Sequence, residues 1–465
     1  MKDLIAAIDL GTTKVVVAVG EKTPNGVKVV GYAEVASKGV KRGRVENIKL
    51  ANQALKKALE KIQEQIGVKI SAAFVGIAGQ DIKCITPEPW QIQRKDFDEL
   101  ITQSEINEIT SLTYNLALED GYKVFHSIPQ AYNVDNYMSV SEPVGMIGKN
   151  IVAKFKVFAG KENSQRIIQN TLKLSGINVQ EIVLEPVASA ESVLTDDEKE
   201  VGCVLVDIGG GTTDVIVMHH NIIRYAAIIP FGGKSVTEDI STGCGIAWDR
   251  AEYIKVNHGC CFSDYAEANK KIMLQGVGGT NNKEIQIKVL ARIIQARMEE
   301  IFEAVMWHIE QSGFKDVLRG GIVLTGGGSQ IKNIVNLASF VTGYEARIAA
   351  PNAYSIDPKS VIEAKKATAS TAVGMLIHAF NKMENDGVSY LGGVNNITLS
   401  QETELLENSA NELETVGVDN SANDGTAVPK ATKKGFGFLR ALKKGGKKIK
   451  DGLTPDGLFS ADNTV

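Results

Sequence analysis

Three short glycine-rich stretches, far apart along the chain, constrain the fold more than any other feature. Each follows a hydrophobic run with the composition of a strand. They read Asp9-Leu10-Gly11-Thr12-Thr13-Lys14, Asp207-Ile208-Gly209-Gly210-Gly211-Thr212-Thr213-Asp214 and Leu324-Thr325-Gly326-Gly327-Gly328-Ser329. The first two are near copies, in which an Asp closes one strand and glycine with two hydroxyl residues precedes the next. This duplication indicates an internal repeat of two related domains.

Turns of this composition point backbone N–H groups and hydroxyls at one spot, which suits a phosphate. A single copy would equally fit an ordinary hairpin turn, in which glycine only supplies a positive φ. Two copies that face each other would hold a polyphosphate from both sides, with Asp9 and Asp207 placed to reach a magnesium ion through water. The sequence therefore predicts a nucleotide bound between two domains.

The three stretches resemble the phosphate-1, phosphate-2 and adenosine motifs of the actin, DnaK-chaperone and sugar-kinase superfamily. Two further segments resemble its connecting helices, namely Glu185-Pro186-Val187-Ala188-Ser189-Ala190 and Thr371-Ala372-Val373-Gly374-Met375. The resemblance implies an α/β, actin-like fold of two lobes, in which a ribonuclease H-like unit is duplicated. It also implies ATP and Mg²⁺ in the cleft between the lobes.

The same resemblance assigns roles to residues. Asp9 and Asp207 are expected to hold water around Mg²⁺, and Glu185 to orient an attacking water, so that Glu185 and Asp207 are the candidate catalytic residues. The expected nucleotide contacts are Gly11, Thr12, Thr13, Lys14, Gly209, Gly210, Gly211, Thr212, Gly232, Gly233, Glu252, Lys255, Gly326, Gly327, Gly328 and Ser329. For Glu252 and Lys255, matched to a ribose-contacting helix, a solvent-facing pair at i and i+3 stays an alternative.

Two other motifs are weaker. Gly232-Gly233-Lys234-Ser235 resembles the end of a P-loop, but the glycine required five residues before Gly233 is Ile228, so we interpret the pair as allowing close approach to the nucleotide. Cys244, His258, Cys260 and Cys261 match no zinc spacing. The five cysteines form no disulfide framework, and we expect reduced thiols.

Charge is distributed unevenly in a chain of 465 residues with a net charge of −4. No Lys or Arg occurs from Met383 to Pro429, whereas eight occur between Lys433 and Lys450 without an acidic residue. The asymmetry marks a functional tail. The start of the chain does not resemble a signal peptide, and no apolar run approaches the length of a membrane span.

A segment of the first half indicates one family within this superfamily. It lies after the last strand of the first repeat and before the helix that leads back into that repeat. It contains His126-Ser127-Ile128-Pro129-Gln130-Ala131-Tyr132-Asn133-Val134-Asp135 and Glu142-Pro143-Val144-Gly145-Met146-Ile147-Gly148, which closely resemble the FtsA family of bacterial cell-division proteins. In that family the actin subdomain 1B is absent and a subdomain 1C is inserted elsewhere in the first half. The prolines and glycines alone would fit any small domain.

The resemblance implies a division into subdomains. We expect 1A over 1–83 and 162–197, 1C over 84–161, 2A over 198–237 and 316–385 with a return to 1A, 2B over 238–315, a disordered linker over 386–432, a membrane-targeting amphipathic helix over 433–450 and a polar tail over 451–465. Apolar patterns predict strands over 4–9, 14–19 and 27–34, a helix capped by Asn47 that runs to about Ile66, and helices over 103–119 and about 283–311.

The basic tail combines a hydrophobic stripe with cations. A helix there would set Gly435, Phe438, Leu439 and Leu442 along one face, which is typical of an interfacial helix. The candidate membrane contacts are Phe436, Phe438, Leu439, Arg440, Leu442, Lys443 and Lys444. Alternatives are a solvated basic end or a nucleic-acid arm, which the Phe-Leu stripe disfavours. Gly445-Gly446 leaves open where such a helix ends.

The resemblance implies a protein that polymerises and tethers FtsZ filaments to the cytoplasmic face of the inner membrane at the division site. Its expected partners are the FtsZ C-terminal tail, further copies of itself, anionic lipid and later divisome proteins, and no nucleic acid. In this family the nucleotide works mainly as an assembly switch, so the resemblance leaves both slow ATP hydrolysis and ATP binding without hydrolysis as expectations. The alternatives are a small-molecule kinase, a chaperone or a pilus-assembly ATPase of the same superfamily.

Overall fold

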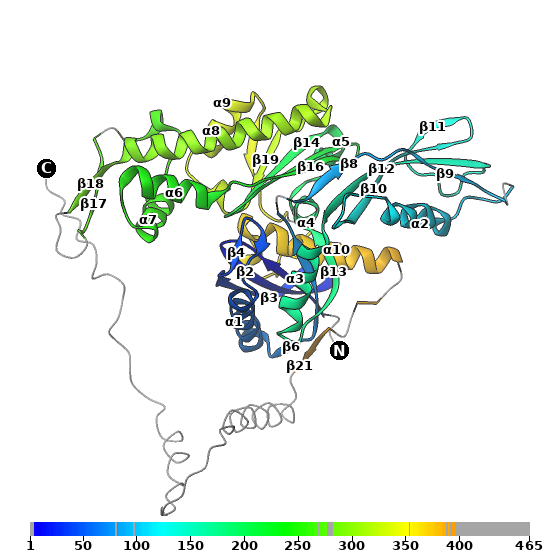
Figure 1. The fold of residues 1–465 in the computed structure, drawn as a ribbon, viewed down its shortest axis with the longest axis horizontal. Coiled ribbons are helices and arrows are strands. Elements are labelled where there is room, and N and C mark those ends of the chain that lie inside the picture. The colour runs from blue at the N-terminus through cyan, green and yellow to red at the C-terminus, as the bar shows by residue number, and fades with distance from the viewer. Residues whose placement is uncertain are drawn as a thin grey trace, which may run out of the picture. The chain divides into compact units, whose positions relative to one another are not determined.

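The computed structural model describes residues 4–79, 81–95, 98–267, 269–276, 282–352, 354–386, 389–390 and 393–396. The first half is built on a five-stranded sheet with the order β13-β7-β1-β2-β3 (Figure 1). Its strands are β1 (Leu4–Leu10), β2 (Lys14–Thr23), β3 (Gly26–Ala36), β7 (Ala72–Ile77) and β13 (Asn178–Leu184). The pairs β1–β2 and β2–β3 are antiparallel, whereas β7 and β13 run parallel to β1.

The second half repeats this architecture. Its sheet has the order β16-β15-β14-β19-β20, with two antiparallel hairpin pairs followed by two parallel pairs. Its strands are β14 (Cys203–Ile208), β15 (Thr213–His219), β16 (Ile222–Ile229), β19 (Ile322–Thr325) and β20 (Ala346–Ile348). Because strand order and direction match those of the first sheet, the predicted duplication is confirmed.

Helices α4 (Glu185–Val193) and α10 (Ser370–Asp386) connect the halves. They pack against each other: α10 also contacts β1, β2 and β7, and α4 contacts β14 and β15 (Figure 1). The apolar side of α10 is buried with residues of β1 and β2 in one core cluster. Two sheets with crossing helices between them are the actin-like fold expected from the sequence.

Helix α1 (Ile48–Ile66) shows how local sequence sets an element. Asn47 caps it, since its side chain accepts a hydrogen bond from the Leu50 N–H, and Gly67 ends it in the left-handed region at φ 65°. The helix is joined to β3 by the hairpin β4 (Val40–Lys41) and β5 (Arg44–Val45). Three further elements of this part are β6 (Val68–Ile70), α3 (Glu162–Lys173) and α5 (Asp196–Val201).

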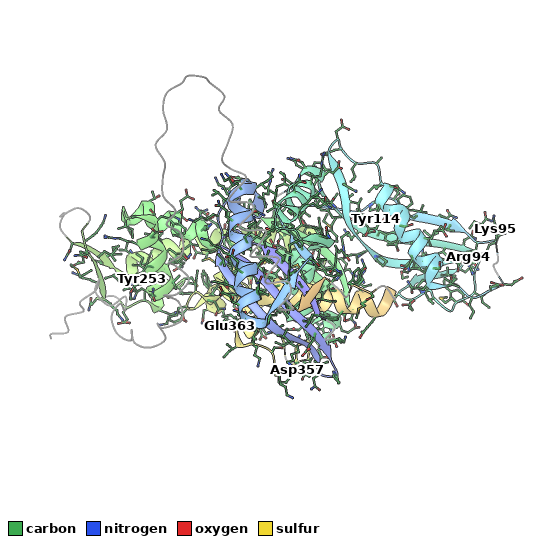
Figure 2. The ribbon with its side chains drawn as sticks, turned by 90° about the horizontal axis from the view of Figure 1, so that it is seen from below. Arg94, Lys95, Tyr114, Tyr253, Asp357 and Glu363 are labelled. Carbon is green, nitrogen blue, oxygen red and sulfur yellow. The ribbon has the colours of Figure 1, made fainter. Side chains whose placement is uncertain are left out.

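The insert forms a separate sheet with the order β11-β10-β12-β8, and β9 pairs with β12. It comprises β8 (Lys83–Ile85), β9 (Trp90–Gln93), α2 (Gln103–Leu112), β10 (Tyr122–Val134), β11 (Tyr137–Val140) and β12 (Asn150–Lys161). Helix α2 is shorter than the predicted 103–119, because a 3₁₀ turn over Thr113–Asn115 follows it. Arg94, labelled in Figure 2, is buried and pairs with Glu105 at 2.7 Å, which ties the end of β9 to α2.

The segment between β16 and β19 is mainly helical. It holds α6 (Gly233–Cys244), α7 (Trp248–His258), β17 (Lys271–Leu274), β18 (Lys283–Gln286) and α8 (Ile287–Ser312), and α9 (Ile334–Thr342) follows β19. The predicted helix over 283–311 is wrong in its first turn, where β18 pairs with β17. The alternating Lys283-Glu284-Ile285-Gln286 buries only Ile285, which is a strand pattern.

The expected linker over 386–432 is wrong in its first residues. Residue 386 ends α10, and β21 (Val394–Asn396) pairs antiparallel with β6, burying Val394. The polar composition of this region concealed the short strand. The rest of the linker, the helix over 433–450 with its candidate membrane contacts from Phe436 to Lys444, and the polar tail lie outside the described residues. In the described part, no helix has the length and apolarity that crossing a membrane requires.

Candidate functional site

A cavity of about 660 Å³ is lined by residues of both halves. The predicted site residues that line it are Asp9, Gly11, Thr12, Thr13, Lys14, Glu185, Asp207, Gly209, Gly210, Gly211, Thr212, Gly233, Glu252, Lys255, Gly326, Gly327 and Gly328. Gly232 and Ser329 do not line it. Gly232 packs on the second glycine turn, and the buried Ser329 hydroxyl donates to the Gly326 carbonyl at 2.7 Å.

The two phosphate-type turns lie against each other. Each connects the first hairpin of its sheet, β1–β2 in the first half and β14–β15 in the second. A Cβ at Gly210 would overlap with the Thr13 side chain, and a Cβ at Gly211 would lie 2.5 Å from the Thr12 Oγ1 atom. Glycine is therefore required in the second turn because the first turn approaches it too closely for any side chain.

Hydrogen bonds hold this pair of turns in place. The Lys234 ammonium, at the start of α6, donates to the Thr12 carbonyl at 2.7 Å and so joins the two halves. The Thr12 hydroxyl accepts a bond from the Gly43 N–H at 2.9 Å. The N–H groups of Gly233 and Lys234 donate to the carbonyls of Gly209 and Gly210, so the amino end of α6 is attached to the second turn.

Lys14 directly follows the first turn. Its ammonium lies 2.7 Å from a Glu34 carboxylate oxygen, and both residues line the cavity. The pair is only partly buried, with side-chain exposures of 21% and 49%. Such an exposed pair contributes little stability, so Lys14 can exchange Glu34 for another anion at small cost.

Four carboxylates gather in the cavity, from Asp9, Glu185, Asp207 and Asp214. Burial raises the pKa of Asp9 to about 6, with Lys14 opposing that shift and Asp207 adding to it. Burial likewise raises the pKa of Glu185 and of Asp214 well above the ordinary value, and neighbouring carboxylates add to it. Asp9 Oδ1 and Asp214 Oδ1 are buried without a hydrogen-bond partner among the described residues.

This arrangement concentrates negative charge that few protein cations balance. Buried carboxylates without partners are costly, and a bound cation is the usual compensation. Within the described residues, no group of three or more His, Cys, Asp or Glu side chains is arranged to hold a metal ion directly. The donor set fits a hydrated hard cation such as Mg²⁺, which keeps several waters.

Asp207 is fixed by hydroxyls from both connecting helices. Its Oδ2 accepts a bond from Ser189 Oγ at 2.7 Å, and Thr371 Oγ1 lies at 3.4 Å. These bonds lower the pKa of Asp207, but burial dominates and raises it. Neither hydroxyl was among the predicted site residues, because the quoted connecting-helix motifs contain them without indicating that they meet.

Where the cavity meets α6 and α7, hydrogen bonds of Lys255 connect the two helices. The Lys255 ammonium donates to Glu252 at 2.7 Å, to Thr237 Oγ1 at 2.8 Å and to the Gly233 carbonyl at 2.9 Å. The two residues form the i,i+3 pair of the alternative, but only 10% of the Lys255 side chain is exposed, against 32% for Glu252, so Lys255 does not face solvent. Its pKa is lowered by burial, which the Glu252 contact opposes.

Lys234 and Asp214 also line the cavity and were not among the predicted site residues. Lys234 stood in the rejected P-loop-like stretch, where the spacing excluded a phosphate loop but said nothing about a contact with Thr12. Asp214 closes the second glycine stretch and pairs with Asp207 across the hairpin, a register that the continuous apolar runs of β14 and β15 do not reveal. The five cysteines form no disulfide with one another, and Cys260 lines the cavity.

The chain matches two family models. Residues 204–374 match the model described as "Cell division protein FtsA", and residues 79–159 match "SHS2 domain inserted in FTSA". Among curated relatives, the cell division protein FtsA of Pseudomonas aeruginosa is 35% identical over 83% of this chain and 91% of its own length. That of Escherichia coli K12 is 30% identical over 81% and 90%.

Solved structures show the same fold at low identity. A PilM-PilN type IV pilus biogenesis complex aligns with a TM-score of 0.57 at 14% identity, covering 81% of this chain and 98% of that chain. MreB5 of Spiroplasma citri bound to ADP aligns with a TM-score of 0.51 at 15% identity, covering 83% and 98%. At this identity the likeness concerns the actin-like fold alone.

Proposed function

This chain belongs to the FtsA family of cell-division proteins, and from that premise we propose that it binds ATP with Mg²⁺ in the cavity between its halves. The observation that carries the proposal is the pair of facing glycine turns beside four buried carboxylates. The backbone N–H groups of the turns suit phosphate oxygens, and the carboxylates suit a hydrated cation. The MreB5 structure contains ADP in the same fold class, which is consistent with this assignment.

Residue roles follow from this placement. Gly11, Thr12, Thr13 and Lys14 bind the β- and γ-phosphates from one side, and Gly209 to Thr212 bind them from the other. Asp9 and Asp207 hold the water shell of Mg²⁺, which supplies charge neutralisation when bound. Gly326 to Ser329 flank the adenosine, and Glu252 and Lys255 orient the ribose.

Glu185 is the residue that would make this protein a slow ATPase. It is buried in the cavity beside Asp9, Asp207 and Asp214, and burial with these neighbours raises its pKa. A carboxylate with a raised pKa is a stronger base and is better able to accept a proton from water. Glu185→Gln should then abolish hydrolysis while ATP binding persists; hydrolysis at the wild-type rate would exclude Glu185 as the water-orienting group.

We further propose that the protein polymerises and tethers FtsZ filaments to the cytoplasmic face of the inner membrane at the division site, and that it recruits later division proteins. Family membership supports this proposal, together with the basic Phe-Leu segment over 433–450. Each cation near anionic lipid contributes about 1 kcal/mol. Ordering the segment on the membrane offsets much of that gain, so one tail binds weakly. A filament that presents many tails binds firmly through effective concentration.

Calorimetric titration of ATP into the full chain tests the nucleotide proposal. We expect saturable binding at one site, weakened at least about tenfold, or 1.4 kcal/mol, when EDTA removes Mg²⁺. Lys83→Ala is a matched control, because Lys83 pairs with Glu119 on the insert and does not line the cavity. It should bind as the wild type does. An absence of saturable ATP binding by the wild-type chain would refute the proposal.

A further inference from the structure

Two hydroxyl groups outside the expected nucleotide contacts hold the carboxylate of Asp207. Ser189 Oγ donates to Oδ2 at 2.7 Å, Thr371 Oγ1 lies 3.4 Å from the same oxygen, and the two hydroxyl oxygens are 3.1 Å apart. Ser189 is fully buried, on α4, and Thr371 lies on α10. Since the Ser189 hydroxyl has one proton to donate, the bond to Asp207 fixes the orientation of this hydroxyl.

The other side of the same carboxylate is confined by backbone. Gly326, at φ 82°, lies so close that a Cβ there would overlap with Asp207 Oδ1 and approach the Ile208 carbonyl at 2.7 Å. The carboxylate therefore sits between the Gly326 backbone on one side and the two hydroxyls on the other. Rotation about its side chain would break a charge-assisted bond or strike the third glycine turn.

We propose that Ser189 and Thr371 are positioning residues, which hold the Asp207 carboxylate in the orientation that binds the water shell of a nucleotide-bound magnesium ion. The inference rests on the nucleotide function proposed above. A water-mediated contact needs an acceptor of fixed direction, and partners behind a ligand commonly supply that direction. Without these donors the carboxylate can turn away, and the ion's water loses its acceptor.

The position of these hydroxyls is set by how the connecting helices cross. Gly374 of α10 lies directly against the Ala188 carbonyl of α4, where a Cβ would overlap with backbone atoms. Ser189 follows Ala188 and Thr371 is one turn before Gly374, so this crossing places both hydroxyls at Asp207. A change in the crossing would move them relative to the carboxylate, which lies on β14 of the second sheet.

The test is a magnesium titration of ATP binding by full-length variants, with the affinity in EDTA measured alongside. Ser189→Ala removes the shorter bond. Ser192→Ala is its matched control, because Ser192 is also fully buried on α4 but bonds to the Ser189 and Ser370 carbonyls instead of Asp207. Thr371→Val and Thr371→Ser form a second pair, which removes or keeps a hydroxyl at the longer contact.

We expect Ser189→Ala to raise the Mg²⁺ concentration at half-saturation about tenfold, and Thr371→Val about threefold, since bonds to charged groups are the stronger ones. Their ATP affinity in EDTA should stay within about twofold of the wild type, a change under half a kcal/mol. Ser192→Ala and Thr371→Ser should keep the wild-type midpoint, even if Ser192→Ala melts at a lower temperature.

Equal midpoints for Ser189→Ala and Ser192→Ala would overturn the inference, and so would a loss of affinity that is the same with and without magnesium. Both results leave the proposed function standing, because the wild type would still bind ATP. A wild-type chain that binds no ATP would instead remove the proposed function and this inference together.

Discussion

At the scale of single residues, the buried carboxylates of the cavity oppose folding in the absence of a bound cation. Burial raises the pKa of Asp9 from 3.8 to about 6. Between these two values the unfolded chain binds fewer protons than the folded chain, so the free energy of unfolding falls as pH rises through that window. Asp207 and Asp214 shift in the same direction.

Asp9→Asn should therefore stabilise the ligand-free protein at pH 7, by about 1–3 kcal/mol, and flatten the pH dependence of unfolding between pH 4 and 6. Urea denaturation at several pH values measures both effects. Asp135→Asn is the contrasting variant, because backbone N–H groups of Lys149 and Asn150 lower the pKa of Asp135. Asp135→Asn should not raise the free energy of unfolding at pH 7. A less stable Asp9→Asn protein at pH 7 would contradict this reading of the cavity.

Gly211 and Gly327 both line the cavity but differ in the room they leave. A Cβ at Gly211 would lie 2.5 Å from Thr12 Oγ1, whereas one at Gly327 would meet only Thr368 Cγ2 at 3.9 Å, with φ −66° suited to alanine. Gly211→Ala should cost about 1–3 kcal/mol of unfolding free energy and Gly327→Ala nothing. Equal unfolding midpoints in urea would show that the turns are not in close contact.

Residue motifs were predictable where the chemistry is local. Asp, glycine and hydroxyl residues after a strand suit a turn that binds phosphate, and the second copy of this pattern disfavours an ordinary hairpin, so Gly11 and Gly209 could be found from the repeated motif. Ser189, Thr371 and Lys234 act on residues far away in the chain. Their contacts depend on how two helices cross and how the two turns face each other, which no local pattern encodes.

At the scale of elements, the crossing of α4 and α10 depends on one glycine. Gly374→Ala would place a methyl group against the Ala188 carbonyl, which cannot move without shifting α4. We expect a loss of about 1–3 kcal/mol in unfolding free energy. Gly243→Ala, inside α6, is the matched control: its Cβ would meet the flexible end of Ile293 at 2.9 Å.

In a helix, alanine is more stable than glycine by about 0.5–1 kcal/mol. Gly243→Ala should therefore leave the free energy of unfolding unchanged or raise it. Chemical denaturation of both variants measures the difference. If Gly374→Ala were as stable as Gly243→Ala, the two connecting helices would not be in the close contact described above.

Elements with strong periodicity were predicted well, and weak ones were not. The hairpins of both sheets and the helix after Asn47 have clear apolar patterns and caps. The first turn of the helix expected from 283 proved to be β18, and the linker expected from 386 begins with the end of α10 and β21. Both strands are short, and pairing with another strand decides their conformation.

At the scale of the whole molecule, two functions are expected in separate parts of the chain: a nucleotide-binding core and a lipid-binding end. Deletion of 433–450 should abolish flotation with anionic liposomes and the recruitment of FtsZ filaments to them, while ATP affinity stays unchanged. A variant with Phe438 and Leu439 changed to Ser should behave like the deletion, because it keeps the charge and removes the apolar stripe. Equal flotation of the full and truncated chains would exclude this tail as the anchor.

The subdomain boundaries and the FtsZ-binding role remain predictions that depend on family membership, whereas the duplicated sheets are visible in the strand order itself. Strand order follows from the repeat, which the sequence carries as two similar glycine stretches. Partners and polymers involve surfaces, and surface chemistry leaves no comparable pattern in one sequence.

The crystal structure of this chain with a non-hydrolysable ATP analogue and Mg²⁺ tests the central claim most directly. We predict phosphate density in contact with the turns at Gly11–Thr13 and Gly209–Thr212, and a hydrated ion beside Asp9 and Asp207. An analogue bound elsewhere, or a cavity that stays without density at saturating concentration, would contradict the account.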